Sequence, residues 1–270
     1  MTYEAHFVDV TLAKTLLGEC DEREAIDHSS EGQRSHILAF VGMAFEARIA
    51  AGPGVLVFSR DGREALAVAA RHGYRGIISF GVAGGLDPVL RPGDWVVASA
   101  ILQPQGAKPT DAAWSKNLLD AIGRAHHAPI VGVDVPVADP AQKRELRRAT
   151  SAAAVDMESH VVAELAAAHG LAFAALRVIV DPAERAIPHA ALAGMGAGAR
   201  ADGAAVLRDL FLRPSQLPAL MRVSFDAFLA CSEMVRVRRR LGPHFGLAKL
   251  TPAGLIGAEL APAAPYRSPA

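Results

Sequence analysis

Between residues 36 and 180, short apolar runs alternate regularly with amphipathic segments. Short apolar runs bounded by glycine, proline or polar residues predict buried strands. These runs occupy 36–42, 54–59, 76–85, 94–101, 129–137 and 171–180, and the glycines that close 76–85 predict a turn after the strand. The segments between them predict helices over 43–52, 61–73, 112–126, 139–149 and 158–169. Strands that alternate with helices favour a mostly parallel sheet covered on both faces.

The same pattern divides the chain into one domain and two flanking segments. Residues 1–35 are polar and predict an N-terminal extension, 36–241 form the domain, and 242–270 predict a flexible tail. Within the domain, the alanine- and glycine-rich stretch 186–203 predicts a flexible loop, and 215–241 predicts a C-terminal amphipathic helix. A chain of 270 residues can bury one large core. We therefore expect a single α/β domain, a three-layer sandwich with a central mixed, mostly parallel sheet flanked by helices.

Composition narrows the classes of function. Lys+Arg and Asp+Glu balance at 28 each, so the net charge gives no reason to expect a nucleic-acid partner. The two cysteines, Cys20 and Cys231, are far apart, and no histidine pair has helical metal-ligand spacing. We therefore expect neither a disulfide nor a metal site. The first residues lack the pattern of a signal peptide, and the apolar span 161–180 carries charges, so we expect a cytoplasmic protein.

Three carboxylates stand at positions that the apolar pattern predicts to lie in the protein interior. Asp156 and Glu158 lie between apolar runs in AAVDMESHVV, and Asp181 ends the apolar run of RVIVDPAE. Burying a carboxylate without a partner costs several kcal/mol, roughly, even after relaxation. The acids therefore need partners, and a bound ligand is one source of them.

A glycine-rich segment precedes these acids. The stretch SFGVAGGL places Gly81, Gly84 and Gly85 at the end of a predicted strand. Glycines there let the backbone approach a ligand and expose N–H groups to an anion or a base edge, although a tight turn has the same requirement. The spacing is not G-x-G-x-x-G, so a dinucleotide site is not indicated.

Three motifs in this order, FGVAGGL with RPGD, VDMES and ALRVIVDPAE, resemble the nucleoside phosphorylase and nucleosidase superfamily, which includes purine nucleoside phosphorylases and methylthioadenosine nucleosidases. The resemblance covers about residues 36–205. The stretches VGMAFEARIAAG, SFGVAGGL and AAVLRDLFLRPSQLPALMR further resemble the hopanoid-associated phosphorylase branch. The resemblance implies a nucleoside phosphorylase-like fold. It also implies cleavage of adenosylhopane, whose ribose carries a triterpenoid at its 5′ carbon, into adenine and a ribosyl- or phosphoribosyl-hopane.

The resemblance implies roles for individual residues. Glu158, at the start of a helix, would accept both ribose hydroxyls, with Met157 packing on the sugar. Asp181, at the carboxyl edge of the sheet, would donate a proton to purine N7, because partial burial raises a carboxyl pKa. Glu46 stands near the place of a water-activating glutamate in hydrolytic relatives. The other expected contacts are with substrate, from Gly81, Val82, Ala83 and Gly84, and with phosphate, from Gly42 and Arg48.

Each of these charged residues also has an ordinary structural interpretation. Asp156 or Glu158 could cap a helix, and we interpret Asp156 as structural. Asp181 could open a turn. Glu46 could lie on the solvated face of its helix, and Arg48 could be an ordinary surface arginine.

The sequence leaves the nucleophile open between phosphate and water. Bacterial purine nucleoside phosphorylases place an arginine where this chain has Ser79, and a phosphate-binding serine where it has Val82. The change weakens a phosphate site, because arginine offers a bidentate fork and valine has no side-chain donor. We expect no cofactor, with phosphate as a co-substrate only if the reaction is phosphorolysis.

A C-terminal apolar stripe lies outside this chemistry. Its members fall at helical spacing: Leu217, Leu220, Met221, Phe225, Phe228 and Leu229. Arg236, Arg238, Arg239 and Arg240 follow as a basic end. Such a helix could rest on the anionic surface of the inner membrane or line the entrance for a greasy 5′ substituent. It could equally pack on the domain as core.

The expected partner is a small nucleoside with an apolar 5′ substituent, and relatives suggest a homodimer or higher homo-oligomer. Two other functions stay open. A methylthioadenosine or adenosylhomocysteine nucleosidase would have a small, closed 5′ pocket, whereas a non-catalytic nucleoside-binding protein would keep the fold without the chemistry.

Overall fold

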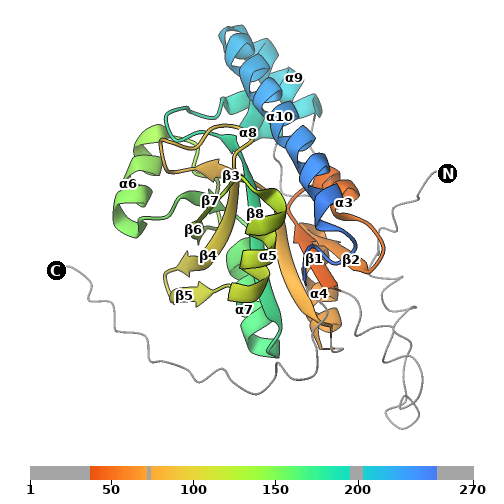
Figure 1. The fold of residues 1–270 in the computed structure, drawn as a ribbon. Helices are drawn as coiled ribbons and strands as arrows, with labels where there is room; N and C mark the ends of the chain where they lie inside the picture. The colour runs from red at the N-terminus through yellow and green to blue at the C-terminus, as the bar shows by residue number, and fades with distance from the viewer. Residues whose placement is uncertain (1–36, 72–73, 195–202, 248–270) are drawn as a thin grey trace.

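A computed structural model describes residues 37–71, 74–194 and 203–247, which form one α/β domain built on a single mixed sheet (Figure 1). The strands are β1 Ile37–Val41, β2 Val55–Ser59, β3 Gly76–Gly85, β4 Trp95–Gln103, β5 Gly106–Pro109, β6 Ala125–Gly132, β7 Ala154–Asp156 and β8 Ala172–Asp181. All of β1 and most of β3 and β8 are buried, as continuous apolar strands in the middle of a covered sheet should be.

The sheet partly closes on itself. Its strand order is β2-β1-β3-β7-β6-β4-β5, and β8 pairs with both β3 and β4. The strands β3, β8, β4, β6 and β7 therefore form a ring, in which β3 is parallel to β8 and antiparallel to the short β7. This closure brings the ends of β3, β7 and β8 together, because Gly84 lies opposite both Val155 and Asp181.

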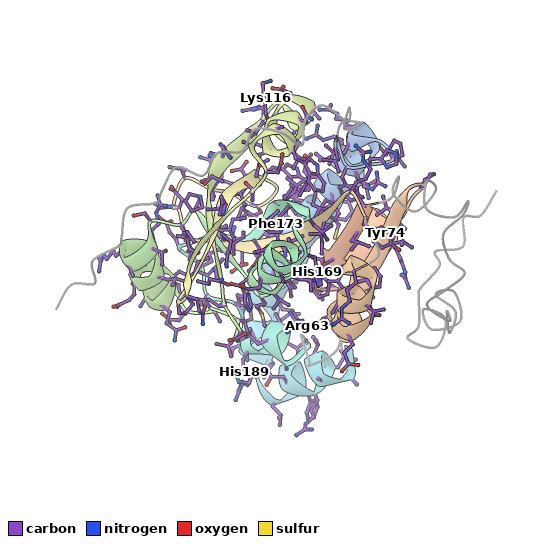
Figure 2. The ribbon with its side chains drawn as sticks, turned by 90° about the horizontal axis from the view of Figure 1, so that it is seen from below. Arg63, Tyr74, Lys116, His169, Phe173 and His189 are labelled. Carbon is purple, nitrogen blue, oxygen red and sulfur yellow. The ribbon has the colours of Figure 1, made fainter. Side chains whose placement is uncertain are left out.

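Helices cover both faces of the sheet. They are α3 Ala44–Ala50, α4 Arg63–Ala70, α5 Ala112–Ile122, α6 Pro140–Thr150, α7 Ser159–His169, α8 His189–Gly194, α9 Gly203–Leu212 and α10 Leu217–Leu241. Helices α4 and α7 share one core cluster with the sheet, whereas α3, α5 and α10 share the other. Figure 2 labels Tyr74 and Phe173, two side chains of the core cluster that the sheet shares with α4 and α7. The predicted single α/β domain with a mixed sheet flanked by helices is confirmed.

Local signals set the helix ends. The Asp111 carboxylate accepts a hydrogen bond from Trp114 N at 2.7 Å, and Asp139 accepts one from Ala141 N at 2.6 Å. These are N-terminal caps, which satisfy backbone donors that the helix cannot use. Gly123 and Gly170 end α5 and α7 with φ of 77° and 61°, a conformation that glycine adopts without steric cost.

Several predicted boundaries are wrong. The strand predicted over 129–137 is β6, Ala125–Gly132, and the short strands β5 and β7 were not predicted. The glycine segment is part of β3 rather than a turn after it, since the strand runs to Gly85. The loop predicted over 186–203 contains α8, while residues 195–202 lie outside the described residues.

The tail predicted from 242 onward begins too early. Phe245 is fully buried, its carbonyl accepts a hydrogen bond from Trp114 Nε1 at 2.7 Å, and its ring lies edge-on to Phe80 at 5.1 Å. The rest of the predicted tail, 248–270, and the predicted extension 1–35 lie outside the described residues. Among the helices of the described part, none is long and apolar enough to cross a bilayer.

Candidate active site

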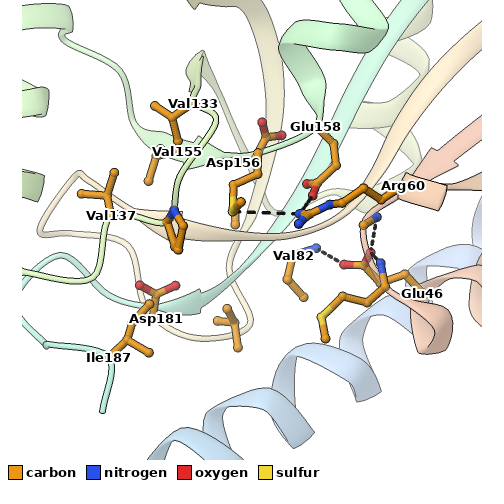
Figure 3. Close-up of a pocket in the computed structure, with 17 residues that line it drawn as sticks. Glu46, Arg60, Val82, Val133, Val137, Val155, Asp156, Glu158, Asp181 and Ile187 are labelled. Carbon is orange, nitrogen blue, oxygen red and sulfur yellow. Dashed lines mark hydrogen bonds and ion pairs between the residues drawn. The ribbon is translucent and has the colours of Figure 1, made fainter. Parts of the chain in front are cut away.

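A pocket of about 100 Å³ opens where β1, β3, β7 and β8 end (Figure 3). Four carboxylates line it: Glu46 from α3, Asp156 from the end of β7, Glu158 from the start of α7, and Asp181 from the end of β8. Apolar side chains close the rest of the wall, among them Val133, Pro136, Val137, Val180 and Ile187. In Figure 3, Asp181 lies at one end and Glu158 and Glu46 lie toward the other.

Asp181 is paired with a fully buried lysine. Lys143 on α6 has no exposed side-chain surface, and its ammonium group donates to Asp181 Oδ2 at 2.5 Å. It also donates to the carbonyl oxygens of Pro182 at 3.0 Å and Arg185 at 3.3 Å. All three ammonium protons therefore have an acceptor, so Lys143 fixes both the carboxylate and the loop that follows it.

Two effects oppose each other at Asp181. Burial raises the pKa of Asp181 to about 6, because desolvation disfavours the charged carboxylate. The charge and hydrogen bond of Lys143 lower this pKa and keep it from rising further. The direction agrees with the sequence prediction, but the lysine was not foreseen.

Glu158 stands at the other end beside two guanidinium groups. Arg60, in the 3-10 helix Arg60–Gly62 that follows β2, forms an ion pair with Glu158 Oε1, and its Nη2 lies 4.0 Å from Met157 Sδ. Arg177 Nη2 lies 3.6 Å from Glu158 Oε2. The side chain of Arg60 is 23% exposed, whereas that of Arg177 is fully buried. Glu158 thus has one partner that can reach solvent and one that cannot.

Arg177 is the central cation of this network. Its Nε lies 2.6 Å from Asp156 Oδ2, and its Nη2 donates to the hydroxyls of Ser79 at 2.5 Å and Ser159 at 3.2 Å. Asp156 also accepts from the backbone N–H of Ser159 at 3.1 Å. The helix-capping role therefore belongs to Asp156, whose structural interpretation agrees with this position, while Glu158 makes no side-chain cap.

Glu46 is held by backbone amides. Its Oε2 accepts from the N–H groups of Gly42 and Met43, and its Oε1 accepts from Val82 N, each at 2.8 Å. Only 1% of Glu46 is exposed, so the alternative of a solvated helix face is wrong. Burial is the largest effect and, with the nearby charge of Glu158, raises the pKa of Glu46 to about 7, while Arg177 opposes the rise.

The glycines make room for these carboxylates. A Cβ at Gly81 would come within 2.4 Å of Glu46 Oε1, and one at Gly42 within 2.7 Å of Glu158 Oε1. A Cβ at Gly84 would lie 3.2 Å from both carboxylate oxygens of Asp181. The sequence predicted an approach of the backbone to a ligand at this segment, whereas the close approaches in the structure are to the protein's own acids.

Most of the residues predicted from the sequence lie together. Those that line the pocket are Gly42, Glu46, Val82, Ala83, Gly84, Met157, Glu158 and Asp181. Gly81 lies beneath Glu46 without lining the pocket. Arg48 is not part of the site, because it is exposed on α3 and borders a separate surface depression with Arg238 and Arg239. Its prediction as a phosphate ligand does not fit this position.

Three cations were missed by the sequence reasoning. Arg177 carried a usable signal, since it is the lone charge inside the apolar run AFAALRVIV and a buried charge needs a partner. Lys143 and Arg60 carried none, because each lies in a segment rich in charges. Within the described residues, no group of three or more His, Cys, Asp or Glu side chains could hold a metal ion.

Comparisons with known proteins place the chain in a family. A family model described as the phosphorylase superfamily matches residues 40–211, more than half of the chain. The chain belongs to the phosphorylase superfamily. No curated protein matches the sequence.

Solved structures of the superfamily share the fold at low sequence identity. Futalosine hydrolase of Helicobacter pylori strain 26695 matches with a TM-score of 0.56 and 17% identity over 78% of this chain and 97% of that one. The methylthioadenosine/adenosylhomocysteine nucleosidase of Neisseria meningitidis, in complex with methylthio-immucillin-A, matches with a TM-score of 0.56 and 16% identity over 77% and 99%. The corresponding Helicobacter pylori nucleosidase, with methylthioadenosine in its active site, gives 0.55 and 17% over 77% and 96%.

Proposed function

We propose that this protein cleaves the N-glycosidic bond of an adenine nucleoside. The observation that carries the proposal is one pocket into which Asp181, Glu158 and Glu46 converge from three separate elements. Breaking the bond places positive charge on the ribose and negative charge on the departing base, so a site needs an acid at the base and anions near the sugar. The solved nucleosidases with methylthioadenosine or methylthio-immucillin-A share this fold.

Asp181 serves the base. In its protonated form it gives its proton to purine N7, and the electron pair of the C1′–N9 bond leaves with the base. The pKa of about 6 keeps a fraction of Asp181 protonated near neutral pH. Lys143 holds the carboxyl group in place during this transfer and stabilises the carboxylate that remains.

Glu158 serves the ribose. Its carboxylate can accept hydrogen bonds from both ribose hydroxyls in place of the bond from Arg60. Arg60 is partly exposed and can move toward solvent, while Arg177 stays near the other oxygen of Glu158. The ribose hydroxyls therefore replace Arg60 as hydrogen-bond partners of Glu158. The Glu158 carboxylate has a partner both before and after the sugar binds.

Water is the nucleophile that this pocket favours. The backbone N–H groups of Gly42, Met43 and Val82, which could otherwise bind an anion, all donate to the Glu46 carboxylate. Ser79 is buried against Arg177, and Val82 has no side-chain donor, so a phosphate would meet Glu46 instead of free donors. Glu46 accepts a proton from water as the water oxygen bonds to C1′.

The substrate that we favour is adenosylhopane, which would release adenine and ribosylhopane. The resemblance of the sequence to the hopanoid-associated branch supports this choice. The exposed apolar surface of α9 and α10, near the loop that follows Asp181, also supports a substrate with a large apolar 5′ group. Methylthioadenosine or adenosylhomocysteine is the alternative, and the small volume of the pocket, about 100 Å³, favours it.

The test is base release by the purified full-length protein. Adenosylhopane in detergent and methylthioadenosine in buffer are each incubated with and without phosphate in water enriched in oxygen-18, and adenine and the sugar product are measured by mass spectrometry. We expect adenine from adenosylhopane without phosphate, with the heavy oxygen at C1′ of the ribose. Asp181→Asn should abolish release, and Asp120→Asn on the surface of α5 should not.

Other outcomes separate the alternatives. Release of adenine from methylthioadenosine but not from adenosylhopane would show that the substrates are small nucleosides. Release only with phosphate, giving a ribosyl phosphate, would contradict hydrolysis. No release from any nucleoside, together with measurable nucleoside binding, would leave a binding protein and overturn the enzymatic proposal.

A further inference from the structure

Helix α10 has one face that is buried against the domain and an opposite face that is apolar but exposed. The face toward the domain carries Asp226, Ala230, Met234, Val237, Arg238 and Leu241, all buried. The opposite face carries the stripe predicted from the sequence, and of its six members only Leu220 is half-buried. Met221, Phe225 and Phe228 are 65%, 61% and 66% exposed. The interpretation of this stripe as core is therefore wrong, although the helix itself does pack on the domain.

Helix α9 extends the same apolar surface. Phe211 is 87% exposed, Leu207 and Leu212 are also exposed, and no residue of α9 is buried. Figure 1 shows α9 and the first half of α10 standing clear of the sheet at one end of the domain. We call the exposed apolar residues of the two helices the α9–α10 surface: Leu207, Phe211, Leu212, Leu217, Met221, Phe225, Phe228 and Leu229. Large exposed apolar patches of this kind mark interaction sites.

The unpaired charges on the helices of the α9–α10 surface are all positive in the described part of the chain. Each carboxylate of the described segment 203–247 is paired with a cation: Asp209 with Arg213, Asp226 with Arg185, and Glu233 with Arg236. Four exposed arginines, Arg208, Arg222, Arg239 and Arg240, have no carboxylate partner in the described part of the chain. The occupant of this surface must therefore accept apolar side chains and offer negative charge.

We infer that the α9–α10 surface docks on an anionic lipid bilayer. Phenylalanine, leucine and methionine side chains enter the boundary between headgroups and acyl chains, while flanking arginines reach the phosphates. A second copy of the chain fits less well, because a two-fold contact would set the same unpaired arginines of both copies around one interface. The charge pattern thus selects lipid over self-association.

The α9–α10 surface is tied to the catalytic pocket. Arg185, in the loop after Asp181, pairs with Asp226 on α10 at 2.5 Å. Ile187 of the same loop lines the pocket, and Ala190 N on α8 donates to Gln216 at 3.1 Å, just before α10. This part of the inference rests on the proposed function: docking would place the pocket beside a bilayer that holds an apolar 5′ group while the nucleoside end enters the site.

The experiment is vesicle flotation with the full-length protein. Vesicles contain phosphatidylcholine alone or with about one third phosphatidylglycerol. The wild type should float with the anionic vesicles only. The triple variant Phe211→Ser/Phe225→Ser/Phe228→Ser and the double variant Arg222→Glu/Arg239→Glu should each lose about tenfold or more of this binding. These side chains are exposed, so folding should be retained, as circular dichroism can verify.

Two matched controls test the location. Arg144→Glu/Arg148→Glu on the exposed side of α6 changes the net charge equally, and Val89→Ser removes an exposed apolar side chain elsewhere. Both should bind like the wild type. An equal loss of vesicle binding in the α6 variant would show that binding depends only on net charge, and would overturn the inference. Failure of the wild type to bind, or conversion of an oligomer to a monomer by the triple variant without a change in flotation, would overturn it as well.

The inference and the proposed function can fail separately. Asp181→Asn should float like the wild type while releasing no adenine. The triple Phe variant should release adenine about tenfold more slowly than the wild type from a nucleoside embedded in anionic vesicles, and its loss should be clearly smaller with the same nucleoside delivered in detergent. Flotation without base release would leave the docking surface standing and contradict the enzymatic proposal alone.

Discussion

The two ends of the pocket each hold a carboxylate paired with a cation, but the cations differ in exposure to solvent. At the base end, Lys143 is fully buried and its ammonium group has three acceptors, of which Asp181 is one. At the ribose end, Arg60 is partly exposed and contacts Glu158 from the 3-10 helix after β2. The buried lysine has no alternative partner in water, whereas the arginine has.

This difference separates two uses of an ion pair. A fixed pair sets the position and pKa of an acid throughout the reaction. A partly exposed pair keeps a carboxylate satisfied until ligand hydroxyls replace its partner, because the released guanidinium can donate to water instead. Substitutions at the base end should therefore change kcat or the pH dependence of kcat/KM, whereas substitutions at the ribose end should change mainly KM.

The largest effect is expected from Asp181→Asn. The amide cannot donate an acidic proton to the base, so kcat for adenine release should fall by about 10³-fold, within the range known for general acids. The Asn side-chain oxygen can still accept from Lys143, so the fold and nucleoside binding should persist, as calorimetry would show. Activity within about tenfold of the wild type would contradict the role of Asp181.

Glu46→Gln should have the next largest effect, a loss of about 10²-fold in kcat. The base must be ionised and its pKa is about 7, so kcat/KM of the wild type should fall on the acidic side of its optimum. Since Asp181 must be protonated and its pKa is about 6, kcat/KM should also fall above the optimum, which lies near these two values. The glutamine variant should lose the acidic limb, whereas the exposed Glu64→Gln should keep both.

Lys143→Met tests the fixed pair. The charge of Lys143 lowers the pKa of Asp181, so its removal should raise that pKa and move the alkaline limb of kcat/KM to higher pH. Breaking a buried pair should also lower the free energy of unfolding by about 3 kcal/mol, measured by urea denaturation. Arg144→Met, exposed on the same helix, serves as control. An alkaline limb that stays in place would show that Lys143 is only a structural anchor.

Arg60→Met tests the exchangeable pair and should have the smallest effect. Without the arginine, ribose hydroxyls no longer compete for Glu158, so KM should fall by about two- to fivefold with kcat nearly unchanged. Glu158→Gln should instead raise KM, because the neutral amide accepts the hydroxyls more weakly. If Arg60→Met raises KM as well, the guanidinium contacts the substrate and the two ends are alike.

The sequence by itself determined most of the core strands and helices and the acids of the site. Strand and helix alternation follows from local periodicity, and the glycines and acids of SFGVAGGL and VDMES stand out because such residues are costly inside a buried pattern. Glu158 and Asp181 were therefore predictable from the pattern as site candidates, whereas Glu46 came from the resemblance to hydrolytic relatives, and the structure brings all three into one pocket.

Only the tertiary structure decided which side chains meet. Lys143 and Asp181 are 38 residues apart in sequence, and Arg60 and Glu158 are 98 residues apart, so no local pattern records either pair. They meet because β7 and β8 close the sheet around β3. The same holds for α10: periodicity reveals an apolar stripe, but whether that stripe faces the core or the solvent depends on which face the rest of the fold covers.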